Sequence, residues 1–215
     1  MKPSTATVAT DALLVKARFD GSHHDEGNFL PALVQSLQHA LPGTPLRVEA
    51  MLSTTQKAFC AYLHFDAQAQ REATITIQLQ SALQTKWPQL KNVQVSRLEK
   101  VFSSSGASAG SQAVFHYIVE MDPEAGWMPE LSNWYDTEHM PGLATVPGCV
   151  RATRYLNHDH GPLSLACYGL MTEETLGSVP WLAVRGTEWS SRMRPRFTNT
   201  IRTMFDVLAN AHQQS

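Results

Sequence analysis

The chain repeats one order of predicted elements on either side of a run of small residues. This run, Ser103–Ser111, contains only Gly, Ser and Ala and predicts a flexible linker near the midpoint of the 215 residues. On each side, strand-like and helix-like stretches follow the order βαββαβ. The matching landmarks are Asp20 with Asp122, Pro42-Gly43 with Pro147-Gly148, and Tyr62 with Tyr168. This duplication limits the fold strongly, because both halves must build the same kind of sheet.

The expected elements cover most of the sequence. In the first half we predict strands at Ala12–Phe19, Leu46–Leu52, Ala58–Phe65 and Val93–Phe102, and helices at Asn28–Leu41 and Ala69–Trp87. In the second half we predict strands at Ala113–Met121, Val150–Leu156, Leu163–Met171 and Thr200–Leu208, and helices at Glu130–Val146, interrupted near Pro141-Gly142, and at Glu173–Arg194. The predicted domains are residues 10–102 and 113–210, joined by a flexible linker at 103–112.

The fold class expected from this order is α+β. A βαββαβ unit most often forms a ferredoxin-like sandwich, an antiparallel sheet with both helices on one face. The other face of each sheet is apolar and needs cover, because large exposed apolar patches are rare on soluble proteins. We therefore predict two ferredoxin-like repeats packed sheet to sheet as a single-chain, pseudo-dimeric α/β barrel. A homo-oligomer is also compatible with the sequence.

Composition and charge narrow the classes of function. The chain is 43% hydrophobic and 17% charged, which is enough apolar material for one or two cores. A net charge of −2 argues against binding driven by phosphate neutralisation, so no nucleic-acid partner is expected. No segment approaches the ~18 apolar residues of a membrane span. Three cysteines without a C-x-x-C pair and no signal peptide predict a cytoplasmic protein.

Strand alternation places polar candidates on the sheet faces that the helices leave open. They are Arg18, Tyr62 and His64 in the first half, and His116, Glu120 and Tyr168 in the second. Apolar walls with a few polar groups are typical of small-molecule cavities. We therefore expect a cavity between the sheets that binds a small hydrophobic or aromatic molecule. Alternatively, these polar groups only pair with one another.

The densest motif is Trp134-Tyr135-Asp136-Thr137-Glu138-His139-Met140-Pro141. On a helix, Tyr135 and His139 are four residues apart and can touch. We expect His139 to be partly exposed at a pocket mouth, where an unperturbed imidazole suits proton transfer near neutral pH. Trp134 would line the pocket, Tyr155 would orient His139, and His116 would be a second titratable group. The alternative is that His139 only hydrogen-bonds the end of its helix.

The pattern W-Y-x-x-E-H-x-P, followed by V-P-G and R-x-x-R-Y, resembles the dimeric α/β-barrel superfamily and, within it, the EthD-like group. The motif covers Trp134–Tyr155, and the βαββαβ frame covers nearly all of Ala12–Leu208. The superfamily includes cofactor-free monooxygenases, muconolactone-type isomerases, polyketide cyclases and haem-handling enzymes, so the resemblance leaves the reaction open. It implies acid/base work for His139 alone. The first half has no matching histidine, so the resemblance implies an asymmetric site.

Other polar clusters are predicted to be structural. We expect His23-His24-Asp25-Glu26 and His158-Asp159-His160 to lie in solvated loops without a metal, because neither has spaced ligands on rigid elements. A basic patch contains Arg185, Arg192, Arg194, Arg196 and Arg202 with Trp189 and Phe197. Arginine stems are expected to pack over Trp189. A phosphate or carboxylate contact is the alternative.

Three hypotheses on function follow from these patterns. The preferred one is a small-molecule enzyme or binding protein that uses His-mediated acid/base chemistry. The second is a catalytically silent structural or partner-binding protein of the same fold. The third, a tandem RNA-recognition module, is weakened because Lys57-Ala58-Phe59 lacks the glycine of that motif. No cofactor is predicted, although haem leaves little sequence signal beyond one ligand.

Overall fold

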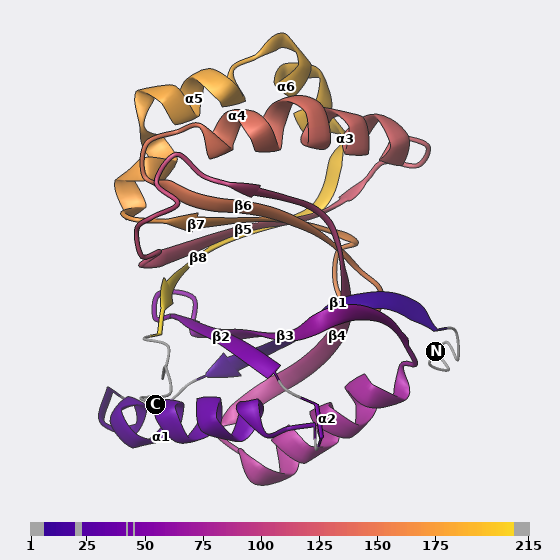
Figure 1. The fold of residues 1–215 in the computed structure, drawn as a ribbon, viewed down its shortest axis with the longest axis vertical. Coiled ribbons are helices and arrows are strands. Elements are labelled where there is room, and N and C mark those ends of the chain that lie inside the picture. Colours follow the sequence, from indigo (N-terminus) through magenta and orange to yellow (C-terminus); the bar gives the residue numbers. More distant parts are fainter. Residues whose placement is uncertain (1–6, 20–22, 42, 45, 209–215) are drawn as a thin grey trace. The chain divides into compact units, whose positions relative to one another are not determined.

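The computed structural model describes residues 7–19, 23–41, 43–44 and 46–208. Within them the chain forms two compact units. Unit 1 contains the described residues up to 99, together with 157–160 and 207–208, and unit 2 contains residues 100–156 and 161–206. In each unit, helices cover one face of an antiparallel sheet (Figure 1). The predicted α+β class and the βαββαβ order of both halves are confirmed.

Unit 1 has the strand order β4-β1-β3-β2, in which every pair is antiparallel. Its elements are β1 (Val8–Phe19), α1 (His23–Gln38), β2 (Leu46–Ser53), β3 (Ala58–Arg71), α2 (Thr74–Lys86) and β4 (Leu90–Ser105). This is the order of a ferredoxin-like sheet, as predicted.

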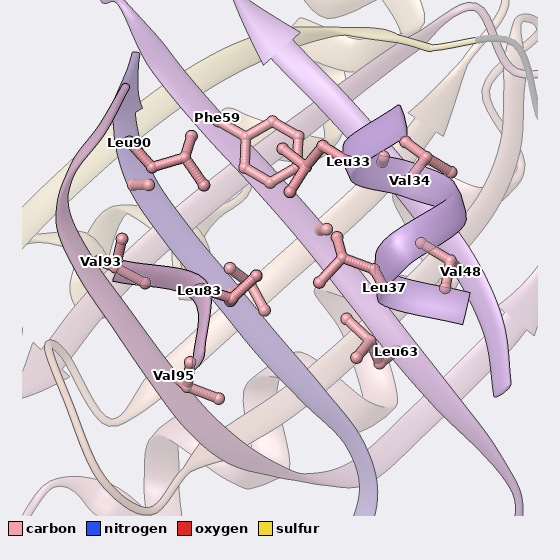
Figure 2. Close-up of a cluster of buried hydrophobic side chains, with 14 of the residues drawn as sticks. Leu33, Val34, Leu37, Val48, Phe59, Leu63, Leu83, Leu90, Val93 and Val95 are labelled. Carbon is pink, nitrogen blue, oxygen red and sulfur yellow. The ribbon is translucent and has the colours of Figure 1, made fainter. Parts of the chain in front are cut away.

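The core of unit 1 lies between the two helices and the sheet. Leu33, Val34 and Leu37 of α1 face the strands (Figure 2). Phe29, Leu33, Leu37 and Leu41 recur at an interval of four residues, the pattern that predicts one apolar helical face, and the first three are buried in this core. Alternate residues of β1, from Leu13 to Phe19, point into the same core, so the predicted phase of this strand is also correct. Each large aliphatic side chain buried here contributes roughly 1.5–3 kcal/mol.

Two helix starts in unit 1 differ from the prediction. Helix α1 begins at His23, so residues 23–26 form its first turn and not a loop; their side chains lie outside the described residues. Helix α2 begins at Thr74, whereas the sequence predicted a helix from Ala69. Residues 69–71 continue β3 instead, because they pair with residues 8–10 of β1. Pairing with another strand overrides the local helix preference of alanine and glutamine.

Unit 2 has the matching strand order β6-β7-β5-β8. Its strands are β5 (Phe115–Pro123), β6 (Cys149–Asn157), β7 (Ser164–Leu170) and β8 (Phe197–Val207). Its first helical segment consists of α3 (Met128–Trp134), the π-helix η1 (Tyr135–His139) and α4 (Met140–Ala144). Its second consists of η2 (Glu173–Gly177), α5 (Val179–Arg185), α6 (Glu188–Met193) and η3 (Arg194–Arg196).

The second helical segment of unit 2 is broken where the sequence predicted one helix. Ser178 and Thr187 have extended backbones, and each accepts a hydrogen bond from a backbone N–H of the helix that follows it. Such side-chain caps start new helices. None of the helices in the described part of the chain is long and apolar enough to span a membrane.

The predicted flexible linker is an ordered part of unit 2. Ser103–Ser105 continue β4, and the N–H groups of Gly106 and Ser108 donate to carbonyls of β6. A Cβ at Gly106 would collide with the Cys149 carbonyl. The small residues therefore allow this segment to lie close to β6. A run of Gly, Ser and Ala is typical of both a closely packed segment and a flexible linker, so composition alone did not distinguish them.

Candidate functional site

The structure divides the predicted site residues between the two faces of the sheets. Trp134, His139 and Tyr168 belong to the core under the helices of unit 2. His116, Glu120 and Tyr155 alternate with residues of that core, so they lie on the opposite face of the same sheet. In unit 1, Arg18, Tyr62 and His64 also face away from the helices. The predicted residues of unit 2 therefore do not form one site.

Tyr168 is the residue whose strand phase was predicted wrongly. In unit 1, Tyr62 pairs with Leu14; in unit 2, the residue that matches Leu14 is His116, which pairs with Gly169. Gly169 is thus the counterpart of Tyr62, and a shift of one residue turns a side chain to the other face. All residues of β7 are buried, so its sequence carries no alternation from which the phase could be predicted.

An aromatic cluster fills the space between the helices and the sheet of unit 2. We define it as Tyr117, Trp134, Tyr135, His139, Tyr168, Trp181 and Phe197. Tyr168 packs edge-on against Trp181 at 5.1 Å between ring centroids, and its hydroxyl donates to the Met140 sulfur at 3.0 Å. Trp134 lies 6.0 Å from Phe197.

The π-helix η1 determines where His139 lies in this cluster. The Met140 N–H donates to the carbonyl of Tyr135, five residues back. Residues five apart on an α-helix point about 140° away from each other, whereas the wider π turn brings Trp134 and His139 to one side. Pro141 has no N–H for the Thr137 carbonyl, which favours such a turn. The predicted break at Pro141-Gly142 is absent; the irregular turn precedes it.

Neighbours of His139 on η1 are held by other elements of unit 2. The carboxylate of Asp136 accepts hydrogen bonds from Arg154, a buried side chain of β6, at 3.2–3.3 Å. Glu138 accepts a hydrogen bond of 2.7 Å from Thr187, the residue that caps α6. The π turn is therefore fixed from the sheet and from the second helical segment.

His139 is buried and neutral, not partly exposed as predicted. The residue is 8% exposed. Burial, with the charges of Arg185 and Arg194, lowers the pKa of His139 to about 3. A contact with Tyr135 is present as predicted, with 5.7 Å between centroids. The predicted help from Tyr155 is excluded, because Tyr155 lies on the opposite face of the sheet from Arg154.

Three buried ring nitrogens of this core have no hydrogen-bond partner among the described residues. They are Nδ1 of His139 and Nε1 of Trp134 and of Trp181. A buried polar atom without a partner costs about 1–3 kcal/mol and calls for an explanation in a native protein. Each of these nitrogens can bond to an oxygen atom of a small molecule, because an indole N–H donates and a neutral imidazole donates or accepts.

The basic patch near the cluster has two kinds of arginine. Arg192 lies 6.0 Å from the Trp189 ring and pairs with Glu130, and Arg196 lies 4.4 Å from the Trp127 ring and pairs with Glu124. These contacts confirm the predicted packing over Trp189. The remaining arginines, Arg185, Arg194 and Arg202, carry charges that act on rings of the aromatic cluster.

On the faces away from the helices, the polar residues have other contacts. His64 lies 3.4 Å from the carboxylate of Glu49 and stacks on Tyr62 with 5.8 Å between centroids. His116 and Glu120 are buried, and Arg18 is exposed. In unit 1 these contacts fit the alternative in which the polar groups pair with one another.

The turn at His158-Asp159-His160 is not a solvated loop, as had been predicted. Asp159 accepts hydrogen bonds from the backbone and the guanidinium of Arg97 at 2.7–3.0 Å, and Arg97 is 1% exposed. Burial alone would raise the pKa of Asp159, but the bonds and charge of Arg97 lower it. Across the part of the chain that the structure describes, no three His, Cys, Asp or Glu side chains are placed to hold a metal ion.

Unit 1 has a surface groove of about 480 Å³ between α1 and α2. Its lining is mostly small or apolar, and the Lys86 ammonium in it already donates to the Ser36 hydroxyl at 3.0 Å. The chemically richer location is therefore the aromatic cluster of unit 2.

Comparison with known proteins finds similar proteins by structure and not by sequence. No family model matches the sequence, and no curated protein matches it either. An anthrone oxidase-like protein superposes with a TM-score of 0.60 at 9% identity, covering 94% of each chain. A chlorite dismutase from Candidatus Nitrospira defluvii superposes with a TM-score of 0.57 at 14% identity, covering 92% of each chain. A heme-degrading enzyme from Listeria monocytogenes superposes with a TM-score of 0.50 at 9% identity, covering 91% of this chain and 98% of the enzyme's chain.

The chain has the fold of the dimeric α/β-barrel superfamily. At these identities the likeness concerns the fold alone. Because the matched part exceeds nine tenths of the chain, it includes both units, and the fold expected from the sequence is confirmed.

Some proteins with a dimeric α/β-barrel fold handle haem, so we tested whether His139 could bind it. An axial ligand needs a ring nitrogen that faces open space for the iron. His139 is only 8% exposed and one face of its ring is covered by Trp134, so the ring has no open space beside it for a haem macrocycle. His139 does not fit that role, and we derive no step through haem.

Proposed function

We propose that unit 2 binds a small aromatic or hydrophobic molecule at the aromatic cluster, between its helices and its sheet. The observation that carries this proposal is the buried, neutral His139, stacked on Trp134 with Nδ1 unpartnered within the described residues. An aromatic ring can stack in such surroundings, and an oxygen on it would supply the missing hydrogen-bond partner.

The chemistry proposed for this site is proton transfer. The neutral imidazole of His139 accepts the proton of a ligand hydroxyl, or of a carbon next to a carbonyl, and later returns it. Its low pKa makes His139 a weak base in the free protein; negative charge on a bound ligand would offset the charges of Arg185 and Arg194, which help to lower this pKa, so we expect a base that acts only within a bound complex. The indole N–H groups of Trp134 and Trp181 are donors that would stabilise negative charge on a ligand oxygen.

The structural relatives support the class of ligand. An oxidase-like protein, a chlorite dismutase and a heme-degrading enzyme are named for small molecules. On the Trp134–Tyr155 motif we propose membership of the EthD-like group. The three buried free cysteines support a reducing, cytoplasmic location.

The proposal is tested by NMR titration with 2-naphthol, anthrone and γ-butyrolactone. We expect at least one compound to shift the imidazole resonances of His139. We expect H139F, which keeps a ring but loses both nitrogens, to weaken that binding about 10-fold or more. H39F, a change at the exposed residue that follows α1, is the matched control. No shift with any of the three compounds, or unchanged affinity in H139F, would overturn the proposal.

A further inference from the structure

We infer that the molecule bound by unit 2 carries a carboxylate, and that Arg185 is the residue that binds this group. The inference rests on the proposed function and specifies the substrate class of that same site. Arg185 would act as a specificity-determining residue, because it recognises a charge and takes no part in the proton transfer at His139.

Arg185 is the last residue of α5 and is half-buried. Other arginines of unit 2 have acidic partners: Arg154 has Asp136, Arg192 has Glu130 and Arg196 has Glu124. Within the described residues, the guanidinium of Arg185 has neither a carboxylate nor a hydrogen-bond acceptor. A half-buried guanidinium with free donors is a ready partner for a planar carboxylate.

Neighbouring residues add positive charge at the same place. Arg194 donates to the backbone carbonyl of Arg185 at 3.0 Å, and it too has no acidic partner among the described residues. Arg202 hydrogen-bonds the Tyr117 hydroxyl, and the charge of Arg185 also acts on Tyr117. Cations gathered at one edge of an apolar cluster repel each other, so an anion bound between them is favoured.

The position of Arg185 also places the carboxylate next to the reactive group. Arg185 and Arg194 both lie close enough to His139 to lower its pKa. A cation at the C-terminus of a helix is favourable, which accounts for an arginine at the end of α5. The helix end does not, however, provide a carboxylate to pair with Arg185. The apolar surroundings favour a singly charged carboxylate over a doubly charged phosphate, because each buried charge costs desolvation.

The test compares two probes of the same shape, 2-naphthoate and its neutral amide 2-naphthamide, by isothermal titration. We expect the wild-type protein to bind 2-naphthoate more than 10-fold more tightly than the amide. We expect R185Q to weaken 2-naphthoate binding about 10- to 100-fold and to leave amide binding unchanged. R192Q removes an exposed arginine that already pairs with Glu130, and we expect it to change the affinity for neither probe.

A second measurement follows the pKa of His139 by NMR. Bound 2-naphthoate should raise this pKa in the wild-type protein, because it neutralises the nearby cations, and should not raise it in R185Q. If R185Q does not fold, R185K is used, which keeps the charge but loses the planar pair of donors. With R185K, weaker 2-naphthoate binding supports the inference and unchanged binding overturns it.

The outcomes separate this inference from the proposed function. If both probes bind wild-type protein equally, or if R185Q weakens both or neither, the carboxylate is not recognised by Arg185 and only this inference fails. If wild-type protein binds neither probe and none of the neutral compounds shifts His139, the proposed function fails as well. Loss of 2-naphthoate binding in R192Q would also overturn the inference, because the charge effect would then be unspecific.

Discussion

Trp134 and His139 stack with 4.2 Å between their ring centroids and 24° between their planes, because a π turn joins two residues that an α-helix would separate. The contact makes His139 part of the core of unit 2. A histidine in that position influences stability as well as chemistry, and the two effects can be measured separately.

The first prediction concerns the packing of His139. We expect H139A to lower the free energy of unfolding by about 2 kcal/mol or more, since it removes a stacked, buried ring. H139F should stay within about 1 kcal/mol of wild type, because it refills the space and removes a buried nitrogen that lacks a partner. Urea unfolding at pH 7 measures both. Equal stability of H139A and wild type would show that the ring is not packed as described.

The second prediction concerns pH. The pKa of His139 is about 3 in the folded protein and ordinarily 6.5. Between these values the unfolded chain binds the proton and the folded one does not, so stability falls as the pH drops below 6.5. The expected slope is about 1.4 kcal/mol per pH unit, or about 2 kcal/mol between pH 6.5 and 5.

H139F provides the control for this pH effect. Compared with wild type, its unfolding free energy should change by about 2 kcal/mol less between pH 6.5 and 5. Asp159 does not interfere in this range, since its pKa lies below 3.8. Parallel pH curves for the two proteins would contradict a lowered pKa at His139.

The third prediction concerns the buried ion pair of unit 1. D159N should lower the free energy of unfolding by about 3–5 kcal/mol, because it removes the negative charge of Asp159 from the buried guanidinium of Arg97. E99Q removes the charge of the partly exposed partner of His158, and it should lower the free energy of unfolding by less than about 1 kcal/mol. Thermal unfolding of the two variants checks the difference. A D159N protein as stable as E99Q would mean that Arg97 keeps access to water.

The fourth prediction concerns the glycine at the end of β4. G106A should destabilise the protein by more than about 2 kcal/mol, because the new methyl group would meet the backbone of residues 149–150. G110A has open space around it and serves as the matched control, with an expected change within about 0.5 kcal/mol. Two equally tolerated variants would restore the interpretation of this segment as a flexible linker.

Much of the fold was predictable, because it depends on local periods. The interval of four in α1 and the alternation in β1 and β5 assigned side chains to the correct face. These elements each have one apolar and one more polar side. The phase of β7 was not predictable, since both of its faces are buried and its register is determined by pairing with β5 and β6.

The candidate site was predictable in part. The motif drew attention to Trp134 and His139, but it predicted an exposed histidine, whereas the structure buries it. The π turn had one signal, Pro141, which was interpreted as a break after His139 and not as the cause of a wider turn before it. The role of Arg185 depends on which carboxylates lie near it in space, and the sequence does not contain that information.

Residues 157–160 begin at the last residue of β6 in the second half, yet they belong to unit 1, where Asp159 pairs with Arg97. A fragment that stops at residue 102 would therefore lack an acid required by its own core. If the chain arose by duplication of a smaller ancestor, the first repeat can no longer form its complete unit alone. It now depends on a turn that is encoded in the second repeat. Cleavage or splitting of the chain near residue 106 should yield pieces that are less stable than either parent half.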